Sequence, residues 1–197
     1  MIFSQNTFNL GLEKNKIKDE KYTYAKEKIF ECLKNKSFGF VEELYKQNFK
    51  EISKLAQRLK KFDNVLFLGT GGSSLGGKTL VSLIINHLYN KTKPKVFFLE
   101  NVDPSSIMGL LKNINLKKTA CVVTSKSGET IETISQFFFI SNCYKKKKIS
   151  IKNKIVVITE DKKSTLKSIQ EEEKLLFSPH PNSIGGRYSV FSIVGLL

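Results

Sequence analysis

Short apolar runs alternate with amphipathic segments over most of the chain. Four runs are apolar almost throughout, at residues 65–68, 96–99, 120–124 and 155–158. They predict strands, and the segments between them predict helices near residues 75–89, 104–112 and 130–145. A strand that is apolar on both faces must be covered on both faces. The pattern therefore predicts an α/β fold, a doubly wound parallel sheet.

The N-terminal part has a different period. Apolar residues recur in steps of three and four over residues 40–62, and a shorter pattern of the same kind covers residues 22–33. Both predict helices, so residues 1–62 are expected to form a helical extension of a sheet domain at 63–180. The apolar segment 188–197 stops without a cap or polar tail. We therefore expect 181–197 to begin a second domain that is missing.

Composition narrows the class of protein. The chain has 197 residues, of which 40% are hydrophobic, enough for one substantial core. No apolar run approaches the roughly 20 residues of a membrane span, and the N-terminus lacks a signal-peptide pattern. The three unevenly spaced cysteines form no CxxC pair, which indicates reduced thiols without a disulfide or zinc site. We expect a soluble, cytoplasmic protein that has no membrane partner.

The formal net charge of +15 would suit a nucleic-acid partner, yet the basic residues are spread along the chain without interleaved aromatics. The densest run, 145–148, is expected to be a solvated helix end. We therefore predict no nucleic-acid binding. Only Arg58 and Arg187 are arginines among 33 basic residues, and Arg187 follows two glycines. An arginine kept in such a turn suggests a need for a planar, permanently charged group.

The first candidate site is the glycine-rich segment 67–79, FLGTGGSSLGGKT, between a predicted strand and helix. Its backbone N–H groups could approach an anion closely, which favours phosphate binding. Gly72–Thr79 also fits the pattern of nucleotide triphosphatases, although Gly77–Lys78 would then fall inside the helix. A dinucleotide-binding loop starting at Gly69, with Glu100 as its ribose-binding acid, is only partly matched. A structural tight turn is the remaining alternative.

The second candidate is TSKSGETIET, residues 124–133, again where a strand meets a helix. It offers the hydroxyls of Ser125, Ser127 and Thr130, the ammonium of Lys126 and the free N–H groups of a first helical turn. These groups suit a phosphate monoester. Ordinary helix capping by Ser127 or Thr130 is the alternative. Capping alone does not explain a lysine between two serines.

The third candidate is NSIGGRYSVFS, residues 182–192. The two glycines allow a ligand to come close, and Arg187 could stabilise an oxyanion. Together the three segments resemble, in order, the G-x-G-G-S-x-L-G, S-K-T-x-T-T-x-E-T and G-G-R-[FY]-S motifs of glucose-6-phosphate isomerases. The resemblance covers about residues 64–197. It implies a sugar-isomerase (SIS) fold, a sandwich of the flavodoxin type.

The resemblance also implies roles for particular residues. Gly72 and Ser73 would line the sugar site, while Gly186 and Arg187 would face the reacting carbons, with Arg187 stabilising an enediolate. The substrate phosphate would be held by Ser125, Lys126, Ser127 and Thr130. No metal or cofactor is implied, and the full-length protein is expected to be a homodimer.

The resemblance is incomplete in two respects. Gly128 and Glu129 replace a bulkier residue and a threonine, a form shared with other SIS phosphosugar-binding domains. The family's base glutamate, ring-opening histidine and lysine lie beyond the third segment, so this chain alone is expected to bind a phosphosugar without isomerising it. His87 is expected to be structural and His180 to be solvated. A non-catalytic phosphosugar-binding module is the main alternative to an isomerase, and a nucleotide binder the lesser one.

Overall fold

A single five-stranded sheet organises the chain. In the computed structural model, which describes residues 19–35, 37, 39–84 and 93–197, all strand pairs are parallel and the order is β2-β1-β3-β4-β5. The strands are β1 (Asn64–Leu68), β2 (Lys95–Leu99), β3 (Thr119–Thr124), β4 (Ile155–Thr159) and β5 (Leu176–Pro179). This is the strand order of flavodoxin-like doubly wound folds. The predicted α/β class is confirmed.

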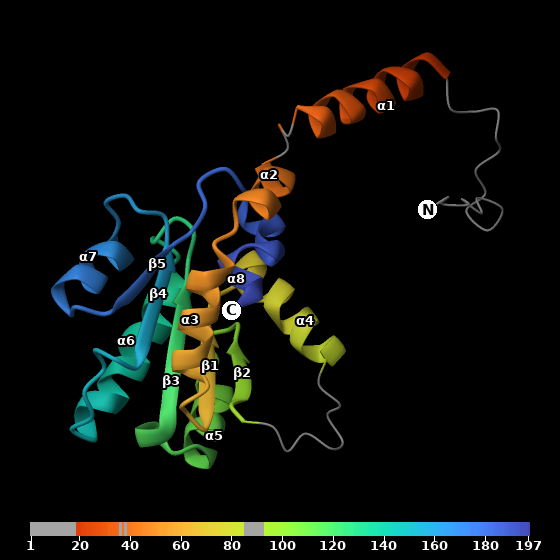
Figure 1. Cartoon of the computed structure of the whole chain (residues 1–197). Coiled ribbons are helices and arrows are strands. Elements are labelled where there is room, and N and C mark those ends of the chain that lie inside the picture. The colour runs from red at the N-terminus through yellow and green to blue at the C-terminus, as the bar shows by residue number, and fades with distance from the viewer. Residues whose placement is uncertain (1–18, 36, 38, 85–92) are drawn as a thin grey trace.

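Eight α-helices and three short 3-10 helices are assigned within the described residues. The α-helices are α1 (Asp19–Lys34), α2 (Gly39–Lys46), α3 (Phe49–Leu59), α4 (Leu75–Ile84), α5 (Pro104–Asn113), α6 (Ile131–Lys146), α7 (Thr165–Glu172) and α8 (Ile193–Leu196). The 3-10 helices are η2 (Gly71–Ser73), η3 (Leu116–Lys118) and η4 (Gly186–Phe191). Figure 1 shows α1 projecting away from the sheet, while α5, α6 and α7 lie against it.

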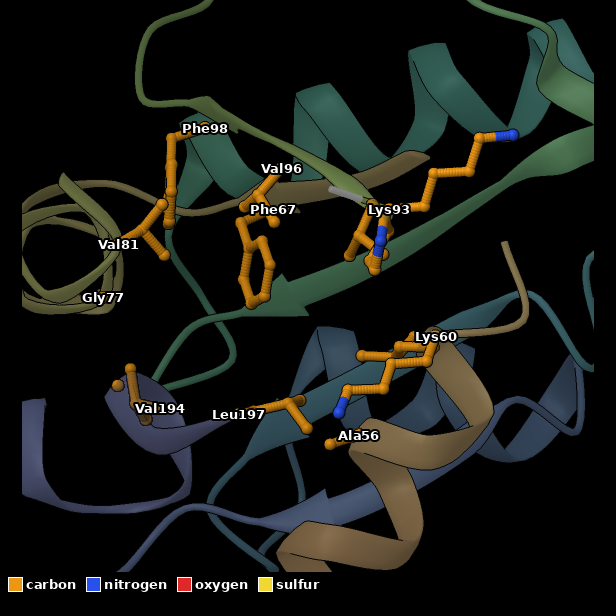
Figure 2. Close-up of a pocket in the computed structure, with 14 residues that line it drawn as sticks. Ala56, Lys60, Phe67, Gly77, Val81, Lys93, Val96, Phe98, Val194 and Leu197 are labelled. Carbon is orange, nitrogen blue, oxygen red and sulfur yellow. The ribbon is translucent and has the colours of Figure 1, made fainter. Parts of the chain in front are cut away.

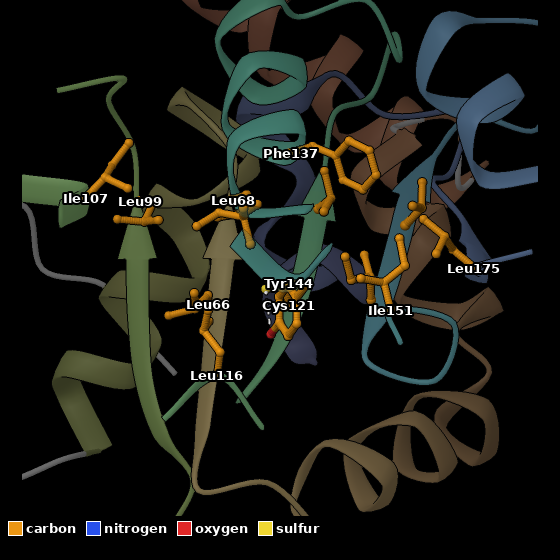
Figure 3. Close-up of a cluster of buried hydrophobic side chains, with 14 of the residues drawn as sticks. Leu66, Leu68, Leu99, Ile107, Leu116, Cys121, Phe137, Tyr144, Ile151 and Leu175 are labelled. Carbon is orange, nitrogen blue, oxygen red and sulfur yellow. Dashed lines mark hydrogen bonds between the residues drawn. The ribbon is translucent and has the colours of Figure 1, made fainter. Parts of the chain in front are cut away.

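Alternate residues of the inner strands face two separate cores. Figure 3 shows the larger one, in which Leu66, Cys121 and neighbouring strand residues meet Phe137 and Tyr144 of α6. On the opposite face, Val65 and Val122 pack with Ile52 of α3 and Ile193 of α8. Both faces are thus covered by helices, as the apolar runs predict.

Several predicted elements differ from those observed. The helix predicted over 40–62 is two helices, because Asn48 interrupts it and its side chain caps α3 by accepting from the Glu51 N–H. The helix predicted over 75–89 ends at Ile84 within the described residues, and 85–89 lie outside them. The strand β5 was not among the predicted elements. The run 145–148 does end a helix, since α6 ends at Lys146.

The C-terminal segment is only partly exposed. Ile193 and Val194 are buried in the second core, whereas Tyr188 and Phe191 are half exposed. The segment therefore packs on the sheet domain, close to α4 and η2. Where the domain borders lie stays a prediction. No helix of the described residues has the length and apolarity needed to cross a bilayer.

Candidate functional site

The three candidate segments reach the same edge of the sheet. The chain leaves β1 for the outer strand β2 and then returns to β3 on the other side of β1, so the loops after β1 and β3 diverge. In open parallel sheets, ligands bind at such a reversal, outside the carboxyl ends of the strands. The first segment follows β1 and the second follows β3.

The first segment makes a tight bend after β1. Gly71 has φ of +55°, a conformation that side chains disfavour, and η2 begins there. Ser74 is 2% exposed and its hydroxyl donates to Glu100 Oε1 at 3.1 Å. Gly72 and Ser73 are half-buried. Glu100 is thus hydrogen-bonded to the bend itself.

The placement of Lys78 bears on the nucleotide alternative. Gly77 and Lys78 lie inside α4, and Lys78 forms an ion pair with Glu100. A phosphate-binding lysine of a nucleotide loop would instead sit at the start of its helix. The structure therefore weighs against this alternative.

Hydrogen bonds within the second segment hold its shape. Ser125 is 1% exposed, its hydroxyl lies 2.8 Å from that of Thr130, and the same oxygen accepts from the Gly128 N–H at 3.1 Å. Ser127 is exposed and accepts from the Glu129 N–H at 3.1 Å. Thr130 precedes the first residue of α6, but its side chain makes no capping bond. Local turn bonds therefore explain Ser125 and Ser127 in part, as the capping alternative anticipated.

Neighbouring backbone fixes the loop against β4 and α7. The Ser125 N–H donates to the Ile158 carbonyl at 3.1 Å, and the Leu166 N–H donates to the Gly128 carbonyl at 3.0 Å. Gly128 has φ of +72°, and a Cβ there would stand 2.2 Å from Ser164 Oγ. Glycine is therefore required at this position, where the family's usual motif has a bulkier residue.

Glu129 has a structural partner. Its carboxylate accepts from both the N–H and the hydroxyl of Thr165, each at 2.7 Å, at the start of α7. The hydroxyl bond and the N–H bond hold the pKa of Glu129 below its ordinary value. The two departures from the family motif, Gly128 and Glu129, thus share one role, docking this loop onto α7.

Lys126 is the cation of the second segment. Its side chain is 32% exposed, and its Nζ lies 3.6 Å from Glu160 Oε1 at the end of β4. The Glu160 N–H also donates to the Lys126 carbonyl at 3.1 Å. No local sequence pattern marks Glu160 as a site residue.

The third segment lies against the first. A Cβ on Gly72 would stand 2.2 Å from the Gly186 carbonyl oxygen and 2.8 Å from the Arg187 nitrogen. The buried Ser189 hydroxyl lies 3.1 Å from the Gly72 carbonyl and 2.6 Å from that of Gly186. Arg187 itself is exposed. The bond from Ser189 to Gly72 spans 117 positions of sequence.

The first and second segments also touch, because a Cβ on Gly69 would stand 3.0 Å from the Thr124 carbonyl oxygen. All eight predicted site residues thus belong to three adjoining segments. They differ in burial. The buried one is Ser125, the half-buried ones are Gly72, Ser73, Lys126, Thr130 and Gly186, and the exposed ones are Ser127 and Arg187. This edge of the sheet is accessible to solvent.

His180 differs from expectation. It is 2% exposed instead of solvated, because it follows β5 and its N–H donates to the Thr159 carbonyl at 2.8 Å. Its Nδ1 lies 2.9 Å from the Pro181 carbonyl, while Nε2 is buried without a hydrogen-bond partner. Burial lowers the pKa of His180, so the imidazole is neutral at pH 7. His87 lies outside the described residues.

A half-open cavity lies elsewhere. Figure 2 shows it between α3, α4 and the end of the chain, with a volume of about 250 Å³ and walls that include Phe67, Phe98 and Leu197. None of the predicted site residues lines it. Over residues 19–35, 37, 39–84 and 93–197, no cluster of three or more His, Cys, Asp or Glu side chains is placed to hold a metal ion.

Comparisons with known proteins agree with this arrangement. Residues 35–197 match the sequence profile described as phosphoglucose isomerase. A probable glucose-6-phosphate isomerase of Methanococcus maripaludis is 34% identical over 200 residues, covering 99% of this chain and 44% of the relative. The chain thus spans less than half the length of that relative.

Solved structures give the same result. A glucose-6-phosphate isomerase of Chlamydia trachomatis aligns with a TM-score of 0.64 and 28% identity, over 79% of this chain and 29% of that one. A hypothetical protein of Thermus thermophilus aligns with a TM-score of 0.72 and 27% identity, over 81% of this chain and 38% of that one. The chain belongs to the phosphoglucose isomerase family.

Proposed function

We propose that this chain is the phosphosugar-binding part of a glucose-6-phosphate isomerase, which interconverts an aldose phosphate and its ketose isomer. One observation carries the proposal: the backbone contact between Gly72 and Gly186 brings Arg187 to the bend that follows β1. The bend in turn touches the end of β3, from which the Lys126 loop starts. Membership of the family and the similarity to the Chlamydia enzyme support this substrate class.

Each segment has a separate task in the proposed reaction. Lys126, Ser127, Thr130 and the first N–H groups of α6 bind the phosphate, where the positive end of the helix dipole adds to the lysine charge. Ser125, which is buried, shapes the loop through its bonds to Thr130 and Gly128. Gly72 and Ser73 line the sugar.

Arg187 carries the electrostatic part of the mechanism. Proton transfer between C1 and C2 passes through an enediolate, whose negative charge needs a fixed positive partner. A guanidinium keeps its charge when water is excluded and presents its N–H groups in a rigid plane. The proton-transferring carboxylate comes from polypeptide outside these residues, so we expect this chain alone to bind substrate without isomerising it.

A coupled assay tests the catalytic half of this proposal. Purified chain is incubated with glucose 6-phosphate, and fructose 6-phosphate is measured against a mock purification. Formation of product above the mock would show that a base within these residues is sufficient. The full-length protein is further proposed to be a cytoplasmic homodimer.

A substitution pair tests the binding half. Lys126→Ala should weaken binding of 6-phosphogluconate by about tenfold or more, because one charge-assisted contact to the phosphate is lost. Lys78→Ala should change it less than threefold, since Lys78 lies on α4 and pairs with Glu100. Calorimetric titration measures both. Equal effects of the two substitutions would remove the assignment of the phosphate loop.

A non-catalytic phosphosugar-binding module is the second candidate, favoured by the Gly128–Glu129 form of the loop. The two candidates predict the same binding by this chain. They are separated by the full-length gene product, which isomerises glucose 6-phosphate only in the first case.

A further inference from the structure

The proposed phosphate loop lies beside a carboxylate that the proposed function does not use. Glu160 is 6% exposed and lies at the carboxyl end of β4, next to the strand from which the loop starts. Acidic side chains are rarely so buried unless they are paired. Its position at an anion site therefore requires an explanation.

Glu160 has two cationic partners. Lys126 Nζ lies 3.6 Å from Oε1, and Lys162 Nζ contacts Oε2 more closely. The hydrogen bond from Lys162 and the charges of both lysines lower the pKa of Glu160, which keeps it ionised at neutral pH. The loop cation is thus partly neutralised by the protein itself.

Backbone hydrogen bonds hold the main chain at Glu160 beside the loop. The Glu160 N–H donates to the Lys126 carbonyl at 3.1 Å, and the Thr159 hydroxyl donates to the same oxygen at 3.3 Å. These bonds hold the backbone at Glu160 beside the loop, within side-chain reach of Lys126. Any anion that reaches Lys126 must compete with the Glu160 carboxylate.

The two lysines differ in how closely they contact Glu160, which lets Lys126 exchange this carboxylate for a ligand. Because Lys162 makes the closer contact, Glu160 keeps a paired charge when Lys126 turns toward a ligand. A buried carboxylate left with no partner would oppose that movement strongly. Lys162 is 60% exposed in its side chain and is free to remain with Glu160.

We propose that Glu160 is a positioning residue of the phosphate site, an internal counter-ion that the ligand phosphate displaces from Lys126 and that limits how tightly the phosphate is held. This inference rests on the proposed function. The site should therefore release phosphosugars readily, because Lys126 pairs with Glu160 again when the ligand leaves.

Charge-neutralising substitutions test it in the full 197-residue chain. Glu160→Gln should tighten 6-phosphogluconate binding by about tenfold, because Lys126 then reaches the phosphate without giving up a charged partner in a poorly hydrated site. Asp161→Asn makes the same change in net charge at an exposed neighbour that pairs with Lys167, and should alter binding less than twofold. Glu160→Asp keeps the charge and should bind as the unmodified chain does.

A double-mutant cycle separates this role from a structural one. In a Lys126→Ala background, Glu160→Gln should improve binding no more than Asp161→Asn does, because the lysine through which it acts is absent. An equal gain in both backgrounds would overturn the proposal. So would unchanged or weaker binding by a Glu160→Gln chain whose thermal unfolding midpoint is unchanged.

A second pair of variants serves if Glu160→Gln does not fold. Lys162→Ala leaves Glu160 with Lys126 alone and should weaken binding severalfold more than the exposed neighbour Lys163→Ala. Equal effects of the two would contradict the proposal.

If the unmodified chain binds no 6-phosphogluconate, the proposed function itself fails. If it binds and Lys126→Ala weakens binding but the Glu160 results fail, only the counter-ion role is lost.

Discussion

Replacing Gly72 by alanine should damage both the fold and the site, because this residue joins two segments that are far apart in sequence. An added Cβ would stand 2.2 Å from the Gly186 oxygen, 2.4 Å from its carbon and 2.8 Å from the Arg187 nitrogen. All three are backbone atoms, so no side chain can move aside. The two bends would have to separate by at least about 0.8 Å to restore a 3.0 Å contact.

The cost can be worked out from these contacts. Overpacking of this kind costs about 1–3 kcal/mol, and weakening the Ser189 bond that spans both carbonyls adds about 1 kcal/mol. Urea denaturation should therefore show a loss of about 2–4 kcal/mol in the free energy of unfolding. Displacing Arg187 by nearly 1 Å should also weaken 6-phosphogluconate binding by about tenfold.

Gly109→Ala is the matched control. Gly109 lies in α5, and a Cβ there would meet nothing within 4 Å. Alanine favours a helix over glycine by about 1 kcal/mol, so this variant should be as stable as the unmodified chain or more stable. If Gly72→Ala unfolded at the same urea concentration as Gly109→Ala and bound 6-phosphogluconate unchanged, the contact between the two bends would be refuted.

Two further predictions concern buried titratable groups. Burial raises the pKa of the Cys121 thiol to about 12. Alkylation of the native chain at pH 8 should therefore modify Cys32 and Cys143 and spare Cys121, which peptide mass analysis measures. Rapid labelling of Cys121 would contradict its burial. Burial also lowers the pKa of His180 below 6.5, so the unfolded chain binds the extra proton and stability falls as the pH drops below that value. From pH 7 to pH 5, urea denaturation should therefore show a smaller loss in the free energy of unfolding for His180→Gln than for the unmodified chain. Equal losses would refute this.

The apolar pattern predicted most of the sheet, because the inner strands are buried on both faces and carry few polar residues. Its limits have physical causes. The strand β5 is a four-residue edge strand that ends in Pro179, too short for a periodic signal. The division between α2 and α3 was hidden because both helices keep an apolar face, and only Asn48 marked a new helix start.

The candidate site could likewise be predicted only in part from local sequence. The order of the three segments predicted which loops would meet, since the loops after parallel strands share one edge. The contacts of Ser189 and Glu160 depend on residues 117 and 34 positions away, which no local pattern encodes. The burial of His180 is likewise set by its attachment to β4, not by the prolines on either side of it.

The span between Gly72 and Gly186 also affects when the site can form during synthesis. The phosphate loop and its braces from β4 and α7 are complete in sequence before residue 186 leaves the ribosome. The bend at Gly72 gains its partner only after more than a hundred further residues have been added, and closing so long a loop needs the sheet to be in place already. A nascent chain should thus acquire its anion-binding loop first and its guanidinium last.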